Sequence, residues 1–246
     1  MSNTPSLTYI LRRNAYRDNS LLLDGFNETE GRITLVARFS KRQAHRIKGM
    51  LEPFRLLDAR WSGRGEVFTL NHAEEKRRYA LKGAALVQAT YLNEVLLRVF
   101  QPLQPLPELF SHYRRLLHEL QQVGNLPAVM QFELAVLATC GQALNLWQND
   151  KDGAAIQPEL NYHFQPERGL WPFYPAADQQ SVLPPDPSQV AQRGVLISGE
   201  LLIALRNPSE LSDLQLRALR GVVDRMLSLQ LDGKTLYARQ LLTMSG

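Results

Sequence analysis

The spacing of apolar residues changes near residue 80, and this change constrains the fold more than any other feature of the chain. In residues 32–38, Ile33, Leu35 and Ala37 alternate with their neighbours on a period of two, which is typical of a β-strand. From residue 85 to residue 99, apolar residues recur every three or four positions, which is the period of an amphipathic helix. The sequence therefore predicts a β-rich N-terminal part followed by a helical part.

Five short strands are expected in the N-terminal part, and Gly31 supplies the turn that joins the second strand to the third. The expected strands cover residues 7–13, 20–26, 32–38, 50–59 and 66–71. Five strands of this length favour a small closed barrel of the OB type, with fragments of an open sandwich as the alternative.

Helices are expected over most of the remaining chain. They cover residues 85–99, 109–123, 127 to about 147, 194–205 and 212–230. Ser212 and Gln215 form a capping-box pattern at the start of the last helix. Residues 161–165 and 170–174 flank a turn and predict an isolated β-hairpin. The predicted fold class is α+β: an OB-type domain at 1–80, then a helical domain at 81–246 with a hairpin insertion at about 148–193.

Positive charge is concentrated in the first domain. Residues 1–82 hold 16 Lys and Arg against 9 Asp and Glu, whereas the rest of the chain holds 12 against 15. No acidic residue lies between Glu30 and Glu52. A basic β-domain joined to a slightly acidic helical part indicates a polyanion-binding module beside a protein-binding one. The alternative for such a run of charge is a solvated loop.

Several classes of protein are disfavoured by composition. No apolar run approaches the roughly 18–20 residues that span a bilayer, and the N-terminus lacks the pattern of a secretory signal. The single cysteine, Cys140, excludes an internal disulfide and a cysteine-based zinc site, and it is expected to be a buried, inert thiol. These features favour a cytoplasmic protein. No glycine-rich loop of the ATP-binding type is present.

Several sequence blocks resemble, in order, those of the bacterial recombination mediator family RecO. They are Leu21–Arg38, Gly49–Phe54 with Gly63–Glu66, Tyr91–Glu94, Phe132–Leu134 and Lys234–Arg239. The resemblance extends over nearly the whole chain. It implies an OB-fold, a helical domain and no enzymatic activity. The residues of this chain themselves predict no cofactor.

The resemblance also implies a role in DNA repair by homologous recombination. The family anneals complementary strands and, with RecR, helps RecA to displace the single-stranded-DNA-binding protein SSB. It therefore implies single- and double-stranded DNA, RecR and the C-terminal tail of SSB as partners, with a functional link to RecA, in the cytoplasm at the nucleoid.

Basic residues of the barrel are the expected DNA contacts, because each neutralised phosphate releases counterions. They are Arg32, Arg38, Lys41, Arg42, Arg46, Lys48 and Arg64. Phe39 and His45 lie among them as candidates for stacking on bases. The acidic SSB tail ends in Phe and needs an apolar pocket with a basic rim. The expected contacts of that tail are Arg98, Tyr113, Arg114, Arg115 and Leu116.

The chain departs from the family pattern in two places. Many relatives bind zinc through two cysteine pairs in the insertion, but residues 148–190 contain no cysteine, so no metal is expected. Met130 and Gln131 occupy positions that are often basic in relatives, which weakens the expected rim for the tail. Two further functions stay open on the residues alone: an RNA-binding OB module, and an interaction scaffold in which the basic barrel has no nucleic-acid role.

Overall fold

The computed structural model describes residues 5–122, 126–174, 194–231, 234 and 236–238. The chain forms two compact units. The first contains residues 1–129 and 235–246, and the second contains residues 130–234. The division into domains at residue 80 stays a prediction. Helices α2 (Gly83–Val99) and α3 (Pro107–Leu120), which follow that residue, belong to the same compact unit as the strands before it.

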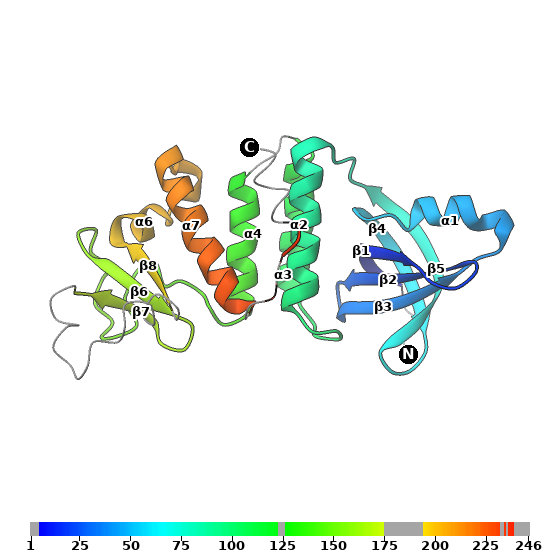
Figure 1. The fold of residues 1–246 in the computed structure, drawn as a ribbon, viewed down its shortest axis with the longest axis horizontal. Helices are drawn as coiled ribbons and strands as arrows, with labels where there is room; N and C mark the ends of the chain where they lie inside the picture. Colours follow the sequence, from blue (N-terminus) through cyan, green and yellow to red (C-terminus); the bar gives the residue numbers. More distant parts are fainter. Residues whose placement is uncertain (1–4, 123–125, 175–193, 232–233, 235, 239–246) are drawn as a thin grey trace. The chain divides into compact units, whose positions relative to one another are not determined.

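Five strands of the first unit close into a barrel in the order β1-β2-β3-β5-β4 (Figure 1). They are β1 (Ser6–Ala15), β2 (Ser20–Asn27), β3 (Gly31–Arg38), β4 (Arg55–Ser62) and β5 (Val67–Arg78). β3 and β5 run parallel, and this pairing closes the barrel, while the other neighbours are antiparallel. The predicted OB-type barrel is confirmed.

The turn between β2 and β3 depends on Gly31, whose φ is +72°. A Cβ at this position would lie 1.7 Å from the carbonyl oxygen of Gln104. The side-chain oxygen of Asn27 accepts hydrogen bonds from the backbone N–H groups of Thr29 and Glu30, both at 2.9 Å. Both the backbone conformation and the close approach of another segment therefore require glycine here.

A helix between β3 and β4 caps the barrel core, and this region corrects the sequence-based prediction. The structure has a short 3-10 helix (Lys41–Gln43) and helix α1 (Ala44–Met50), and β4 begins only at Arg55. The predicted strand over residues 50–59 therefore starts five residues too early. Ala44, Ile47 and Met50 pack on the barrel core at a spacing of three residues, which is helical rather than strand periodicity.

Helices α2 (Gly83–Val99) and α3 (Pro107–Leu120) follow the barrel in the first unit. An aromatic cluster joins α3 to the outside of the barrel: the Phe110 ring lies 5.3 Å from that of Tyr9 and 5.5 Å from that of Phe26. Asn93 of α2 donates to the carbonyl oxygen of Leu11 in β1 at 2.8 Å. The barrel and these two helices therefore share one packed interior.

Helix α4 (Leu126–Thr139) ends earlier than the sequence suggested. Gly141 adopts a φ of +78°. Its N–H donates to the carbonyl oxygen of Ala138, and the N–H of Gln142 donates to that of Leu137, both at 2.9 Å. This is a Schellman motif, which terminates the helix. The predicted extension to about residue 147 is wrong because the glycine was not read as a stop signal.

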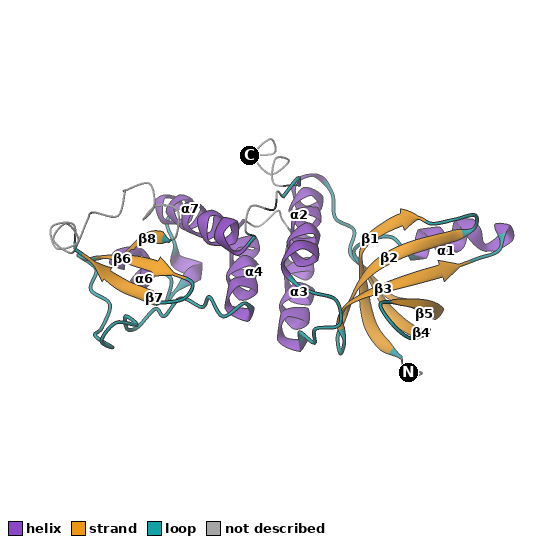
Figure 2. Cartoon of the chain, turned by 60° about the horizontal axis from the view of Figure 1, so that its bottom comes forward, coloured by secondary structure: helices purple, strands orange, loops and turns teal. Residues whose placement is uncertain are grey.

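A three-stranded antiparallel sheet and two helices form the rest of the second unit (Figure 2). They are β6 (Asn161–Gln165), β7 (Gly169–Phe173), β8 (Val195–Ser198), α6 (Gly199–Ala204) and α7 (Asp213–Gln230), with a 3-10 turn at Pro208–Glu210. The predicted hairpin is confirmed, but it is not isolated because β8 pairs with β6. Val195 and Ile197 are buried while Leu196 is exposed, so the start of the predicted helix at 194 is a strand instead.

Two polar features organise α7. Ser212 and Gln215 form the capping box that the sequence predicted. Arg220 donates to both oxygens of the fully buried Glu133 of α4, at 2.5 and 2.9 Å, and also pairs with Asp224. Burial opposes the charge on Arg220, but the hydrogen bonds to Glu133 outweigh it and raise the pKa of the guanidinium. The guanidinium of Arg220 thereby neutralises the buried negative charge of Glu133.

Candidate nucleic-acid interface

Five exposed cations gather on and beside the outer face of α1. We call residues 38–48 the basic segment. Its cations are Arg38, Lys41, Arg42, Arg46 and Lys48. The other face of α1 is held on the barrel core by Ile47 and Met50, so the amphipathic helix presents its charge outward. Figure 1 shows α1 extending from the side of the barrel away from α2 and α3.

The cations of the basic segment differ from those of β4 and β5 in their partners. On β4 and β5, Glu75 pairs with Arg55 and with Arg78, and Lys76 lies 3.0 Å from Glu74 and 3.7 Å from Asp58. Within the described part of the chain, no ion pair involves a cation of the basic segment. These charges are therefore free to neutralise an external anion.

The end of α1 is fixed to the barrel by Arg13 of β1. Its guanidinium donates to the carbonyl oxygen of Lys48 at 2.7 Å and pairs with Glu52 at 2.7 Å. The Lys48 ammonium lies 5.7 Å from the centre of the Phe39 ring. Phe39 itself is only 8% exposed and belongs to the barrel core, so its predicted role in stacking on bases is wrong. His45 is exposed and stays a candidate.

Arg17 was not among the residues selected from the sequence, yet it lies beside the basic segment. It is exposed in the tight turn between β1 and β2. That turn adjoins the end of β3, because the N–H of Phe39 donates to the carbonyl oxygen of Asn19 at 3.0 Å. The hairpin pairing of β1 with β2 was the signal that could have brought Arg17 into the predicted site.

Arg32 makes structural contacts at the other end of β3. Its side chain donates to the carbonyl oxygen of Phe100, and its own carbonyl oxygen accepts from the N–H of Leu103 at 2.8 Å. Burial lowers the pKa of this guanidinium. Arg32 therefore ties β3 to the segment between α2 and α3, and the structure does not group it with the predicted DNA contacts.

Arg64 is exposed but also lies apart from the basic segment. It occupies the turn between β4 and β5, between two glycines with positive φ. The next residues enter β5, where Val67 pairs with Thr34 near the middle of β3. The basic segment begins at the end of β3, so Arg64 presents its charge to a different part of the surface.

The structure buries some of the residues predicted to contact the acidic SSB tail and exposes others. Tyr113 is completely buried and Leu116 is 3% exposed, so the apolar groove expected between them on the surface is wrong. Both side chains face the interior of the first unit instead. Arg114 and Arg115 are exposed on α3. Arg98 lies 3.7 Å from Glu94 and over the Tyr237 ring at 5.6 Å.

Cys140 lies at the end of α4 with intermediate exposure. Burial raises the pKa of its thiol to about 11, which keeps it protonated at neutral pH and therefore a poor nucleophile. Among the described residues, no three His, Cys, Asp or Glu side chains are arranged to hold a metal ion. No described helix has both the length and the apolar character to cross a bilayer.

Comparisons with known proteins identify the family. A family model described as recombination protein O, N terminal, matches residues 1–79, and one described as recombination protein O, C terminal, matches residues 81–237. The chain belongs to the RecO family. The DNA repair protein RecO of Vibrio parahaemolyticus is 32% identical over 235 residues, which cover 95% of this chain and 90% of the relative. That of Methylococcus capsulatus is 35% identical over 240 residues, covering 96% and 92%.

Two of the RecO-like sequence blocks meet in the first unit. Glu94 of the Tyr91–Glu94 block accepts hydrogen bonds from the backbone N–H groups of Tyr237 and Ala238, at 3.0 and 2.7 Å. These residues belong to the Lys234–Arg239 block. The carboxylate thus holds the chain on α2 where it returns to the first unit, which gives both RecO blocks a structural role.

Proposed function

We propose that this RecO-family chain is a recombination mediator in DNA repair that binds single- and double-stranded DNA through the basic segment. The observation that carries the proposal is the group of five exposed cations that have no acidic partner among the described residues and are fixed on a closed OB-type barrel. A surface of unpaired cations attracts a polyanion and gains entropy from the counterions it releases. OB barrels are a common platform for single strands.

The proposed activity is annealing of complementary strands without covalent chemistry. Two strands repel each other through their phosphates, and a dense group of cations lowers this repulsion so that bases can pair. The Debye length at physiological ionic strength is about 8 Å, so only cations close to the phosphates act in this way. Neither an enzymatic step nor a cofactor enters the proposed mechanism.

The proposed partners follow from membership of the family. We propose that the chain recognises the C-terminal tail of SSB, acts with RecR and helps RecA to load onto SSB-coated DNA. The burial of Tyr113 and Leu116 removes the apolar part of the tail site expected on α3. Arg98 also has an acidic neighbour of its own in Glu94.

An annealing assay tests the proposal. Complementary oligonucleotides, bare or coated with SSB, are mixed with the wild-type chain, and duplex formation is followed on gels. The wild type should accelerate annealing, and Arg42→Glu/Arg46→Glu should abolish most of the acceleration. Lys151→Glu/Arg217→Glu changes the charge equally at exposed sites of the second unit and should have no effect. A wild-type protein that leaves the rate unchanged would refute the annealing role.

Competition between RNA and DNA strands distinguishes the proposal from its two alternatives, an RNA-binding module and a scaffold without a nucleic-acid role. An RNA strand of the same sequence should compete more weakly than DNA if the proposal holds, and more strongly if the barrel is an RNA-binding module that contacts 2′-hydroxyl groups. A scaffold without a nucleic-acid role predicts negligible, salt-insensitive affinity for both strands.

A further inference from the structure

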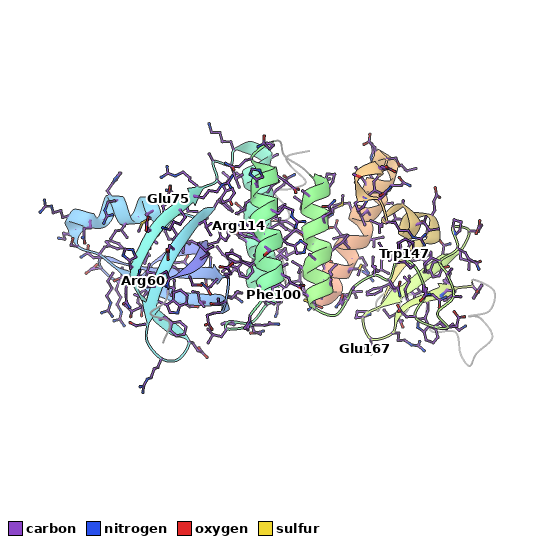
Figure 3. The ribbon with its side chains drawn as sticks, turned by 180° about the vertical axis from the view of Figure 1, so that it is seen from behind. Arg60, Glu75, Phe100, Arg114, Trp147 and Glu167 are labelled. Carbon is purple, nitrogen blue, oxygen red and sulfur yellow. The ribbon has the colours of Figure 1, made fainter. Side chains whose placement is uncertain are left out.

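A second group of basic side chains, two arginines and a histidine, lies where β5 meets α3 in the first unit. It consists of Arg77, Arg114 and His118, and we call it the seam cluster. All three side chains are exposed. Arg114 and His118 are four residues apart on α3 and therefore share one face of the helix. Figure 3 shows Arg114 where the helices meet the barrel.

The contacts of Arg77 join the two elements. Its Nη2 lies 3.0 Å from Nδ1 of His118, and because a guanidinium can only donate, the imidazole nitrogen accepts. The guanidinium carbon lies 4.9 Å from the centre of the Tyr79 ring. The hydroxyl group of Tyr79 is 3.2 Å from that of Tyr9, on which the charge of Arg114 also acts. Arg77 is thus held over a buried tyrosine pair, and His118 links it to the face of α3 that carries Arg114.

Among the residues that the structure describes, no acid pairs with the arginines of the seam cluster, unlike the cations of the neighbouring part of β5. Glu75 pairs with Arg55 and Arg78, and Lys76 has Glu74 and Asp58. In the described regions, neither Arg77 nor Arg114 has an ion-pair partner. Arg77 uses a hydrogen bond to an imidazole, and its aromatic support fixes the guanidinium without cancelling its charge.

The surroundings favour a phosphate chain over an amphipathic peptide. The apolar side chains of α3 beside Arg114, at positions 113, 116 and 117, are at most 3% exposed. The described face of α3 beside Arg114 therefore offers no exposed apolar side chain to the hydrophobic anchor of a peptide, whereas a phosphate needs only planar donors and positive charge.

We propose that the seam cluster is a second phosphate-binding subsite for DNA, in addition to the basic segment. This inference rests on the proposed function, because the ligand is the same polyanion. Arg77 and Arg114 each donate to a phosphate oxygen. His118 orients Arg77 from the helix side. The subsite adds two cation–phosphate contacts to those of the basic segment.

Salt dependence of binding to a single-stranded oligonucleotide of saturating length tests the inference on the full chain. Arg77→Ala/Arg114→Ala should flatten the log–log salt slope by about 1.4, from roughly 0.7 for each lost contact on a single strand. Lys151→Ala/Arg217→Ala removes the same charge from exposed positions elsewhere and should leave the slope unchanged. A folded seam variant with the wild-type slope and affinity would overturn the inference.

A second measurement on the wild type covers the case in which the variant does not fold. Phenylglyoxal modifies accessible arginines, and bound DNA should protect Arg77 and Arg114 while leaving Arg217 reactive, as read by mass spectrometry. Equal modification with and without DNA would also overturn the inference. Failure of the proposed function looks different, since the wild type would then show no salt-dependent DNA binding at all. Protection by an acidic peptide but not by DNA would contradict the inference too.

Discussion

Helices α1 and α3 both cover the barrel, but they do so with different chemistry. α3 buries six residues, including Phe110 and Tyr113 against Tyr9 and Phe26. α1 has no fully buried residue and rests on Ala44, Ile47 and Met50, which are partly buried. The outward face of α1 carries cations that have no acidic partners among the described residues.

Because of this difference, we assign a stabilising role to α3 and a ligand-binding role to the outer face of α1. Burial of aromatic surface is the main source of stability at α3. Unpaired like charges on α1 repel each other and add nothing to stability, so a ligand accounts for them better than folding does. We therefore expect substitutions on the inner face of α3 to act on stability, and those on the outer face of α1 to act on DNA binding.

Phe110→Ala should have the largest effect on stability. Its ring is 1% exposed and contacts both Tyr9 and Phe26. Removal of such a ring costs about 3–5 kcal/mol of unfolding free energy, measurable by urea denaturation. At a temperature where the variant is folded, its DNA affinity should match the wild type. A loss of affinity in the folded variant would break the separation between the two helices.

Tyr113→Phe should destabilise less. The Tyr113 hydroxyl group donates to the side-chain oxygen of Asn93 at 2.5 Å, and Asn93 in turn donates to the carbonyl oxygen of Leu11. Loss of this donor in a buried network costs about 1–3 kcal/mol. Denaturation of Asn93→Ala and of the double variant completes a thermodynamic cycle. Strictly additive effects would show that the hydrogen bond does not join α3 to α2.

Glu75→Gln should have the smallest effect on stability and a distinct pH dependence. Burial raises the pKa of Glu75, but hydrogen bonds from Arg78 and Arg55 outweigh it, so its pKa is lowered from 4.5. The wild type therefore gains stability above about pH 4.5 and loses it as the pH falls through the lowered pKa. The variant should be about 1 kcal/mol less stable at pH 7, and this difference should shrink below pH 4.

The same variant sharpens the comparison of paired and unpaired cations. Without the carboxylate, Arg78 loses its acidic partner, and its side chain is 60% exposed. The salt slope for DNA should then steepen by up to about 0.7. An unchanged slope would indicate that release from an ion pair is not sufficient to recruit a cation to the interface.

Strands and most helices were predictable because their periodicities are local. The alternation of Ile33, Leu35 and Ala37 determines which face of β3 enters the barrel, and the structure buries these residues. Helix α1 was missed because its apolar spacing covers only seven residues and overlaps the start of an expected strand. The end of α4 was missed because Gly141, a residue type that commonly ends helices, was not read as a stop signal; its φ of +78° shows that it is one.

The charges of the candidate site were predictable, but their partners were not. Arg38, Lys41, Arg42, Arg46 and Lys48 share a sequence segment, so composition alone groups them. Arg32 fits the same composition, yet its role depends on Phe100, which is 68 residues away along the chain. Burial of Tyr113 and Leu116 likewise depends on tertiary packing, since an apolar stripe on a helix faces a core more often than a ligand.

Salt dependence of single-strand binding tests the role of the basic segment most directly. Five phosphate contacts at roughly 0.7 each predict a log–log slope near −3.5 for this segment. Arg38→Ala/Lys41→Ala/Arg42→Ala should flatten the measured slope by about two units without changing the melting temperature. Lys151→Ala/Arg217→Ala/Arg225→Ala, with the same change of charge, should leave it unaltered. A folded basic-segment variant that keeps the wild-type slope and affinity would contradict the proposed DNA site on the basic segment.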